Sequence, residues 1–228
     1  NEGTLTNEGT LTNEGTLINS GKLNLNGGTL NLNGGSLTTG TFDNTAGGTF
    51  NFRGGTLTVN GGTFSTNSLT TYGNGGPVLD GNNPTLVLSG SRWEQPYHIL
   101  FEVGRQESGT IIVENGGFLG TNSPNTSIGR FSGTGVVTVS GSGSQWNNSY
   151  WLYLGAYGTG TLNVLDGGVV NNTYGYMGHY SSGSTGTATV SGSGSRWNNS
   201  SELWVGTTGT GSLNVEAGGV VSNTTGYV

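Results

Sequence analysis

Val137-Thr-Val-Ser-Gly-Ser-Gly-Ser-Gln-Trp-Asn-Asn-Ser149 occurs again 51 residues later, nearly unchanged, as Ala188-Thr-Val-Ser-Gly-Ser-Gly-Ser-Arg-Trp-Asn-Asn-Ser200. Without a gap, 27 of the 41 positions in 137–177 are identical to their counterparts in 188–228. Self-similarity at a fixed period is the signature of a repeat architecture, in which each unit buries its apolar side against the next. The stretch therefore predicts a solenoid rather than a single compact core.

The 51-residue unit is itself double. Trp146 and Leu154 of its first half correspond to Val170 and Met177 of its second half, at similar distances from a Gly-rich turn. Each half holds three short runs that alternate apolar and polar residues, separated by Gly, Ser and Asn, which is the pattern of strands and turns. Three short parallel strands per rung, each paired to the next rung at about 4.8 Å, define a parallel β-helix. We expect an all-β, right-handed parallel β-helix.

Equivalent residues of successive half-repeats should stack in columns. We expect two inward columns that form the core and one amide ladder at a corner. The columns are Val139, Val164, Val190 and Val215; Leu154, Met177, Val205 and Val228; and Asn148, Asn172, Asn199 and Asn223. Three tryptophans recur at one repeat position and are expected as core or corner residues: Trp93, Trp146 and Trp197.

The composition fits a thin stacked core. Of 228 residues 47 are Gly, only 30% are hydrophobic and 8% are charged, against about 45–50% and about 25% in ordinary globular domains. The net charge is −6 without a basic patch, which argues against nucleic-acid binding. The chain has no cysteine and no apolar stretch of membrane-spanning length, so we expect no disulfide and no membrane insertion by this segment.

The chain divides into three parts of one continuous solenoid. Residues 1–69 contain units of six or seven residues, such as Asn1-Glu-Gly-Thr-Leu-Thr6, which predict short rungs. Residues 70–136 are irregular, with proline-containing loops and a divergent third copy of the 51-residue repeat. Residues 137–187 and 188–228 are the two regular copies, each expected to form a double rung.

The repeated motif resembles a known bacterial repeat. Thr-Val-Ser-Gly-Ser-Gly-Ser-x-Trp-x-Asn-Ser, followed by Gly-Thr-Gly-Thr-Leu-x-Val and Gly-Gly-x-Val, is similar to the repeat of autotransporter (type V secreted) passenger domains and of some PEP-CTERM-associated surface proteins. The resemblance covers 86–228, strongly in the last two copies. It implies an extracellular or cell-surface β-helix, often the stalk of an adhesin, and it carries over no catalytic residue.

One outward column is the candidate contact face. If Leu154 and its equivalents face inward, the residues before them face outward, one per rung, and two further aromatics flank them. The column is Tyr153, Tyr176, Trp204 and Tyr227, flanked by Trp151 and Tyr174. It either stiffens the sheet or offers a flat surface to glycans, to a host surface or to a second copy.

These patterns predict a structural and adhesive protein that is either a stalk or a fibre-forming element. We expect no enzymatic activity, no cofactor and no metal. The alternative is a carbohydrate-active β-helix, a tailspike-like hydrolase or lyase, with convergent carboxylates near Glu94 and Glu102. His98 and His179 are isolated and lack the spacing of metal ligands.

Overall fold

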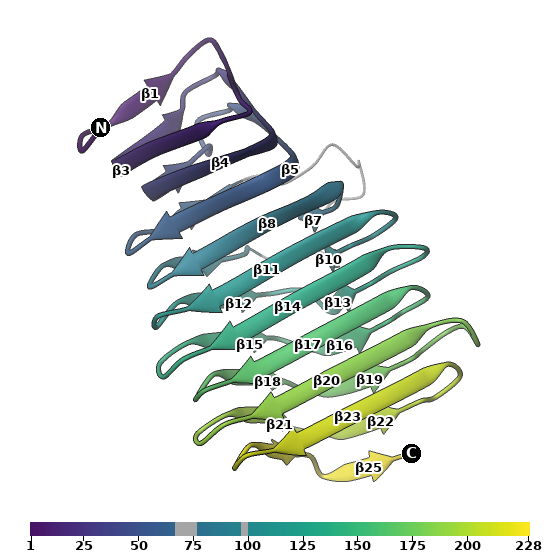
Figure 1. The fold of residues 1–228 in the computed structure, drawn as a ribbon. Helices are drawn as coiled ribbons and strands as arrows, with labels where there is room; N and C mark the ends of the chain where they lie inside the picture. The colour runs from purple at the N-terminus through teal and green to yellow at the C-terminus, as the bar shows by residue number, and fades with distance from the viewer. Residues whose placement is uncertain (67–76, 97–99) are drawn as a thin grey trace.

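The computed structural model describes residues 1–66, 77–96 and 100–228, and every regular element in these ranges is a β-strand (Figure 1). The named strands pair in parallel throughout, and they stack along one axis from the N-terminus to the C-terminus. The parallel β-solenoid predicted from the repeat is therefore confirmed. No described helix is long and apolar enough to cross a membrane.

The strands belong to three sheets, which we call A, B and C. Sheet A contains β1 (Leu5–Asn7), β2 (Thr10–Asn13), β3 (Thr16–Leu25), β4 (Thr29–Asp43), β5 (Thr49–Asn60), β6 (Phe64–Ser65), β8 (Asn82–Ser89), β11 (Ser108–Glu114), β14 (Thr134–Ser140), β17 (Thr159–Leu165), β20 (Thr185–Ser191) and β23 (Thr210–Glu216). Sheet B contains β9 (Arg92–Glu94), β12 (Phe118–Thr121), β15 (Gln145–Asn148), β18 (Val169–Asn172), β21 (Arg196–Asn199) and β24 (Val220–Ser222). Sheet C contains β7 (Val78–Leu79), β10 (Leu100–Val103), β13 (Asn125–Ile128), β16 (Trp151–Leu154), β19 (Tyr174–Met177), β22 (Glu202–Val205) and β25 (Thr225–Tyr227).

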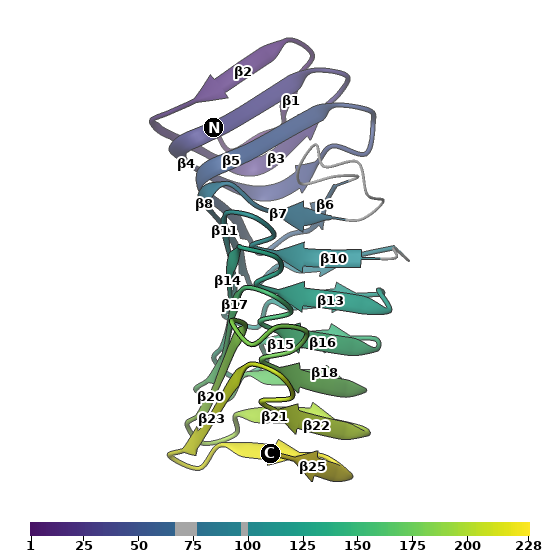
Figure 2. The same cartoon turned by 90° about the vertical axis from the view of Figure 1, so that its right-hand side faces the viewer.

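From β11 onward the chain visits sheets A, B and C in a fixed order. In Figure 1 the strands of sheet A face the viewer, and in Figure 2 they lie to the left of the strands of sheet C. Followed through both views from β11 to β25, the chain winds as a right-handed helix. The turn from sheet A to sheet B needs left-handed backbone, which Asp166 (φ 52°) and Gly167 (φ 93°) supply after β17.

The N-terminal rungs differ from the expected short strands. Leu5 pairs with Leu23, one rung on, as the hexads predict. However, β3, β4 and β5 run through corners as strands of 10, 15 and 12 residues. The corners appear as register shifts, for example between Asn19 and Lys22, because the backbone keeps pairing with the next rung while it bends. The predicted boundary at residue 69 lies outside the described residues.

The predicted core columns are largely present. Val139, Val164 and Val190 are in register and fully buried, and each such side chain stabilises the fold by roughly 1.5–3 kcal/mol. Leu154 and Met177 are likewise paired and buried. Val215 continues its column in register with Val190 but is 48% exposed, because β23 is the last strand of sheet A. The inward placement of Val228 is wrong: the residue follows β25, the last strand of sheet C, and is fully exposed. The recurring tryptophans are buried as expected: Trp93, Trp146 and Trp197.

The corner amide ladder is displaced from its predicted position. Asn172 Nδ2 donates to Asn199 Oδ1 at 2.6 Å. Asn148 instead accepts hydrogen bonds from the hydroxyls of Thr121 and Thr126, and Asn223 is exposed. The longer ladder lies one residue earlier in each strand, on the outer face of sheet B: Asn198 Nδ2 donates to Asn171 Oδ1 at 2.9 Å, and Asn171 Nδ2 donates to Asn147 Oδ1 at 2.7 Å.

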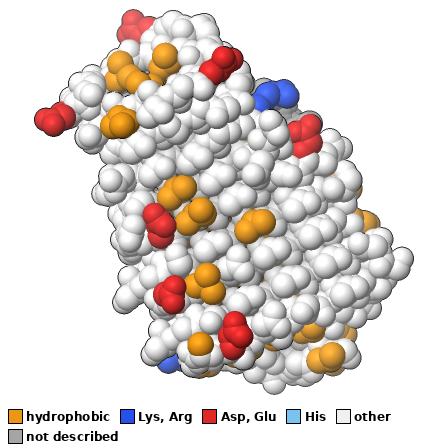
Figure 3. Space-filling view, viewed as in Figure 1, with side chains coloured by type: hydrophobic (Ala, Val, Ile, Leu, Met, Phe, Trp, Pro, Cys, Tyr) orange, Lys and Arg blue, Asp and Glu red, His pale blue; other side chains and the backbone are white. Residues whose placement is uncertain are grey.

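The outer face of sheet A carries mainly hydroxyl and amide side chains, with few charged ones (Figure 3). One of its two nine-residue columns contains eight Thr or Ser residues and one Val: Thr16, Ser36, Thr56, Thr85, Thr110, Val136, Thr161, Thr187 and Ser212. The most exposed aromatic side chains of the described residues lie elsewhere, on sheet C and on the loops beside it.

Candidate functional site: the aromatic face of sheet C

The structure places the predicted aromatic residues in one column across β16, β19, β22 and β25. Their rings stack along the solenoid axis at interplanar angles of 15–21°. The centroid distances are 5.2 Å for Tyr153–Tyr176, 6.4 Å for Tyr176–Trp204 and 3.7 Å for Trp204–Tyr227. We call this column the strand ladder. It follows from the parallel register, which sets equivalent side chains of adjacent strands directly above one another.

The expectation that the whole strand ladder faces solvent is wrong for Tyr153, which is only 6% exposed. The loop after β19 covers it, with the rings of His179 and Tyr180 at 5.6 and 5.5 Å. The Tyr180 hydroxyl donates to the Tyr153 hydroxyl at 3.2 Å. Burial, followed by this hydrogen bond, raises the pKa of Tyr153 far above its usual value. Tyr176 and Trp204 are half-buried, and Tyr227 is 39% exposed.

The flanking pair is also in register, with Trp151 opposite Tyr174. Both residues are half-buried at the N-terminal ends of their strands. The Tyr150 ring lies against both, 4.7 Å from Trp151 and 5.3 Å from Tyr174. This cluster extends the aromatic surface toward the corner between sheets B and C.

A second aromatic column, which the sequence analysis missed, lies on the loops from sheet C to sheet A. Phe131 and Tyr157 stack at 5.9 Å and 16°, and Tyr157 and Tyr180 stack at 5.2 Å and 14°. These three side chains, which we call the loop ladder, are 40%, 43% and 48% exposed. A signal for them existed: each is the second residue after the glycine that ends a rung, namely Gly129, Gly155 or Gly178.

Two members of the loop ladder have left-handed backbone, which is uncommon for a bulky residue. Phe131 has φ 51° and Tyr180 has φ 70°. Such a conformation costs on the order of 1–2 kcal/mol per residue, so the neighbouring rungs must hold it in place. Strained residues of this kind concentrate at functional sites.

A buried ion cluster lies beside Phe131. Glu102 is fully buried on β10, and its carboxylate accepts hydrogen bonds from Arg105 (2.8 Å) and from Arg130. Both guanidinium groups lie over the Phe131 ring, at 5.2 and 4.8 Å from its centroid. The nearby Asp80 accepts hydrogen bonds from the backbone N–H groups of residues 105–107. The cluster fixes the side chains that border the loop ladder.

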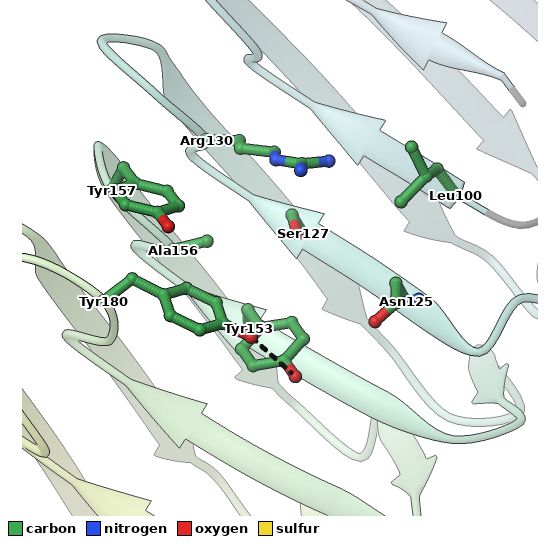
Figure 4. A pocket seen from close by; sticks show the side chains of 8 residues that line it. All are labelled: Leu100, Asn125, Ser127, Arg130, Tyr153, Ala156, Tyr157 and Tyr180. Carbon is green, nitrogen blue, oxygen red and sulfur yellow. Dashed lines mark hydrogen bonds between the residues drawn. The ribbon is translucent and has the colours of Figure 1, made fainter. Parts of the chain in front are cut away.

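A hollow of about 350 Å³ opens between the two ladders (Figure 4). Strands β10 and β13 supply Leu100, Asn125 and Ser127 to its lining, and β16 supplies Tyr153. The loops after β13, β16 and β19 add the remaining side chains, which are Arg130, Ala156, Tyr157 and Tyr180. The hollow therefore combines flat aromatic walls with a few polar groups.

The residues considered for catalysis are not brought together. Glu94 lies on sheet B and forms an exposed ion pair with Arg92, whereas Glu102 lies on sheet C in the buried cluster. His98 lies outside the described residues, and His179 Nδ1 is within hydrogen-bond distance of Thr207 Oγ1. Among the described residues, no three His, Cys, Asp or Glu side chains are grouped so that they could hold a metal ion.

Two bacterial proteins are similar to parts of this chain. "Adhesin BmaC autotransporter" of Brucella suis biovar 1 (strain 1330) is 30% identical over 129 residues, which are 54% of this chain and 4% of that protein. "Uncharacterized lipoprotein YdeK" of Escherichia coli (strain K12) is 30% identical over 152 residues, 62% of this chain and 11% of that protein. The chain thus spans only a small part of the length of either relative. No family model and no solved structure matches the chain.

Proposed function

We propose that this chain is an extracellular structural and adhesive segment of a bacterial surface or secreted protein, and that the aromatic face of sheet C is its contact surface. The observation that carries the proposal is the pair of aromatic ladders, which lie side by side on a rigid parallel scaffold. Exposed Phe131, Tyr157, Tyr180 and Tyr227 rings form an amphipathic surface of the kind that suits glycans and protein partners.

The similarity to an autotransporter adhesin supports this assignment. So does the low charge of the chain, because a solenoid with few ionic groups relies on its regular backbone pairing and stacked side chains for stiffness. The rod would hold its aromatic face at a fixed orientation, and the flat rings would make contact without a large loss of side-chain entropy.

The test is adhesion to a glycosylated surface. Wells are coated with mucin, or with the same mucin after enzymatic removal of its glycans, and attachment of the chain is measured for wild type, Trp204→Ala and Tyr227→Ala. Ile18→Ala is the matched control, since Ile18 is an exposed apolar residue (58%) on sheet A. We expect each aromatic variant to lose about fivefold or more in apparent affinity, corresponding to roughly 1 kcal/mol for a truncated interface aromatic. Equal attachment of all four proteins, or none to either surface, would refute the proposal.

A further inference from the structure

We propose that the hollow between the two ladders is a binding site for one uncharged pyranose residue of a glycan. The inference rests on the proposed adhesive function and names the ligand class of that same face. Six side chains carry it: Asn125, Ser127, Arg130, Tyr153, Tyr157 and Tyr180.

Stacked rings form one wall of the hollow. Tyr157 and Tyr180 lie nearly parallel, at 14°, and both are more than two-fifths exposed. Neighbouring rings of the loop ladder cover part of each face, and the part that stays exposed is available to a sugar. That surface is electron-rich, so it attracts the polarised C–H groups on the flat side of a sugar ring.

The polar groups lie where the hydroxyls of a stacked sugar would reach them. Ser127 and Asn125 come from β13, and within the described ranges the Asn125 amide makes no side-chain hydrogen bond. A free amide offers both a donor and an acceptor, which is the pairing that a sugar hydroxyl needs. Arg130 has five N–H donors and uses one on Glu102, so donors remain at the edge of the hollow.

The charges favour an uncharged ligand. The guanidinium of Arg130 is already paired with Glu102, whose carboxylate is fully buried. Asp80 and Glu102 together balance Arg105 and Arg130, and the whole chain carries a net charge of −6. A uronic acid or a phosphorylated sugar would therefore meet no unbalanced cation and would be repelled at long range.

The site is largely preformed. Tyr180 is held by its hydrogen bond to Tyr153 and by its left-handed backbone, so its ring needs little reordering on binding. The volume of about 350 Å³ is near the lower end of the range of about 300–1,000 Å³ for small-molecule sites. That size suits a single sugar ring, with the remainder of the glycan directed along the strand ladder.

The experiment is saturation-transfer NMR on the whole chain with free methyl pyranosides: methyl hexosides, a methyl uronoside and a hexose phosphate. We expect a methyl hexoside to bind in the millimolar range, and the two acidic sugars to bind more weakly. Tyr157→Ala and Asn125→Ala should weaken binding at least several-fold, and Tyr157→Phe should retain most of it because the ring remains. Ile18→Ala, which removes an exposed apolar side chain of sheet A away from the aromatic face, is the control and should leave binding unchanged.

Three outcomes overturn the inference. These are that no hexoside binds, that an acidic sugar binds more tightly than every hexoside, or that Ile18→Ala weakens binding as much as Tyr157→Ala. If the chain adheres to intact mucin while no hexoside binds, the adhesive function stands and the hollow is not its sugar site. If the chain adheres to neither mucin surface, the adhesive function itself has failed.

Discussion

Gly160→Ala tests the close approach of successive rungs most directly. Gly160 is a buried residue of β17 without left-handed backbone, so its substitution probes space alone. A Cβ atom there would lie 2.2 Å from the carbonyl oxygen of Ile128 and 2.3 Å from the backbone nitrogen of Gly155. Ordinary contacts are 3.4–4 Å, so the backbone would have to move by about 1 Å against a ladder that fixes the spacing of the strands.

The expected cost lies at or above the upper end of the usual penalty for overpacking, about 3 kcal/mol, because two backbone segments must shift rather than one flexible side chain. Repeat proteins unfold through local openings, so a single midpoint of unfolding is a poor measure of this loss. Hydrogen exchange reports it locally. A loss of about 3 kcal/mol predicts that amides of β17 and β20 lose about 100-fold in protection.

The matched control is Gly34→Ala. Gly34 also lies within a strand, β4, and a Cβ there would have no neighbour within 4 Å. We expect it to be neutral or to stabilise the fold by about 0.4–1 kcal/mol, since alanine restricts the unfolded chain. If a folded Gly160→Ala protein kept wild-type protection in β17 and β20, the argument from rung spacing would be wrong.

Three other outcomes are expected. Glu102→Gln should lower the stability of β10 and β13 by about 3–5 kcal/mol, measured by hydrogen exchange, because it leaves two partly buried arginines without their carboxylate. Glu94→Gln, in an exposed pair, should cost its own strand under about 1 kcal/mol, and similar costs for both variants would contradict the buried cluster. Trp197→Phe should cost about 1–3 kcal/mol beyond its lost buried area, since Trp197 Nε1 donates to buried Asn172 at 2.7 Å; unchanged hydrogen-exchange protection in β18 and β21 would count against this bond. Because burial raises the pKa of Tyr153 above 10.0, its stabilising contribution is complete below about pH 10 and is lost as the pH rises further; an alkaline titration of tyrosinate absorbance should show one more late-ionising tyrosine in wild type than in Tyr153→Phe.

The β-solenoid scaffold could be predicted from the sequence because parallel pairing is regular. A shift of 51 residues aligns Val139 with Val190, and a half shift aligns Val139 with Val164, so the inward columns follow from counting. The same counting yields the strand ladder, because residues adjacent to an inward side chain face outward.

The rest of the candidate site depends on contacts with loop residues, which the repeat spacing does not predict. Tyr153 belongs to an outward column, yet it is covered because the loop after β19 folds back over it through Tyr180. Glu102 occupies a position that is Ser127 and Tyr153 on the next two strands, and its burial depends on Arg130, 28 residues away. The loop ladder could have been located by its constant offset from Gly129, Gly155 and Gly178, but the exposure and stacking of its rings depend on the loop backbone.

The in-phase stacking of half-repeats has an evolutionary consequence. Strands β17 and β23 both pair with β20, and the residues of β17 match those of β23 at a distance of 51. Removal or duplication of a 51-residue unit would therefore place equivalent strands next to each other without a break in register. Unequal recombination within the encoding DNA could therefore lengthen or shorten the rod in whole units. The length of the rod and the number of its aromatic rungs would then be heritable variables that change without any new fold.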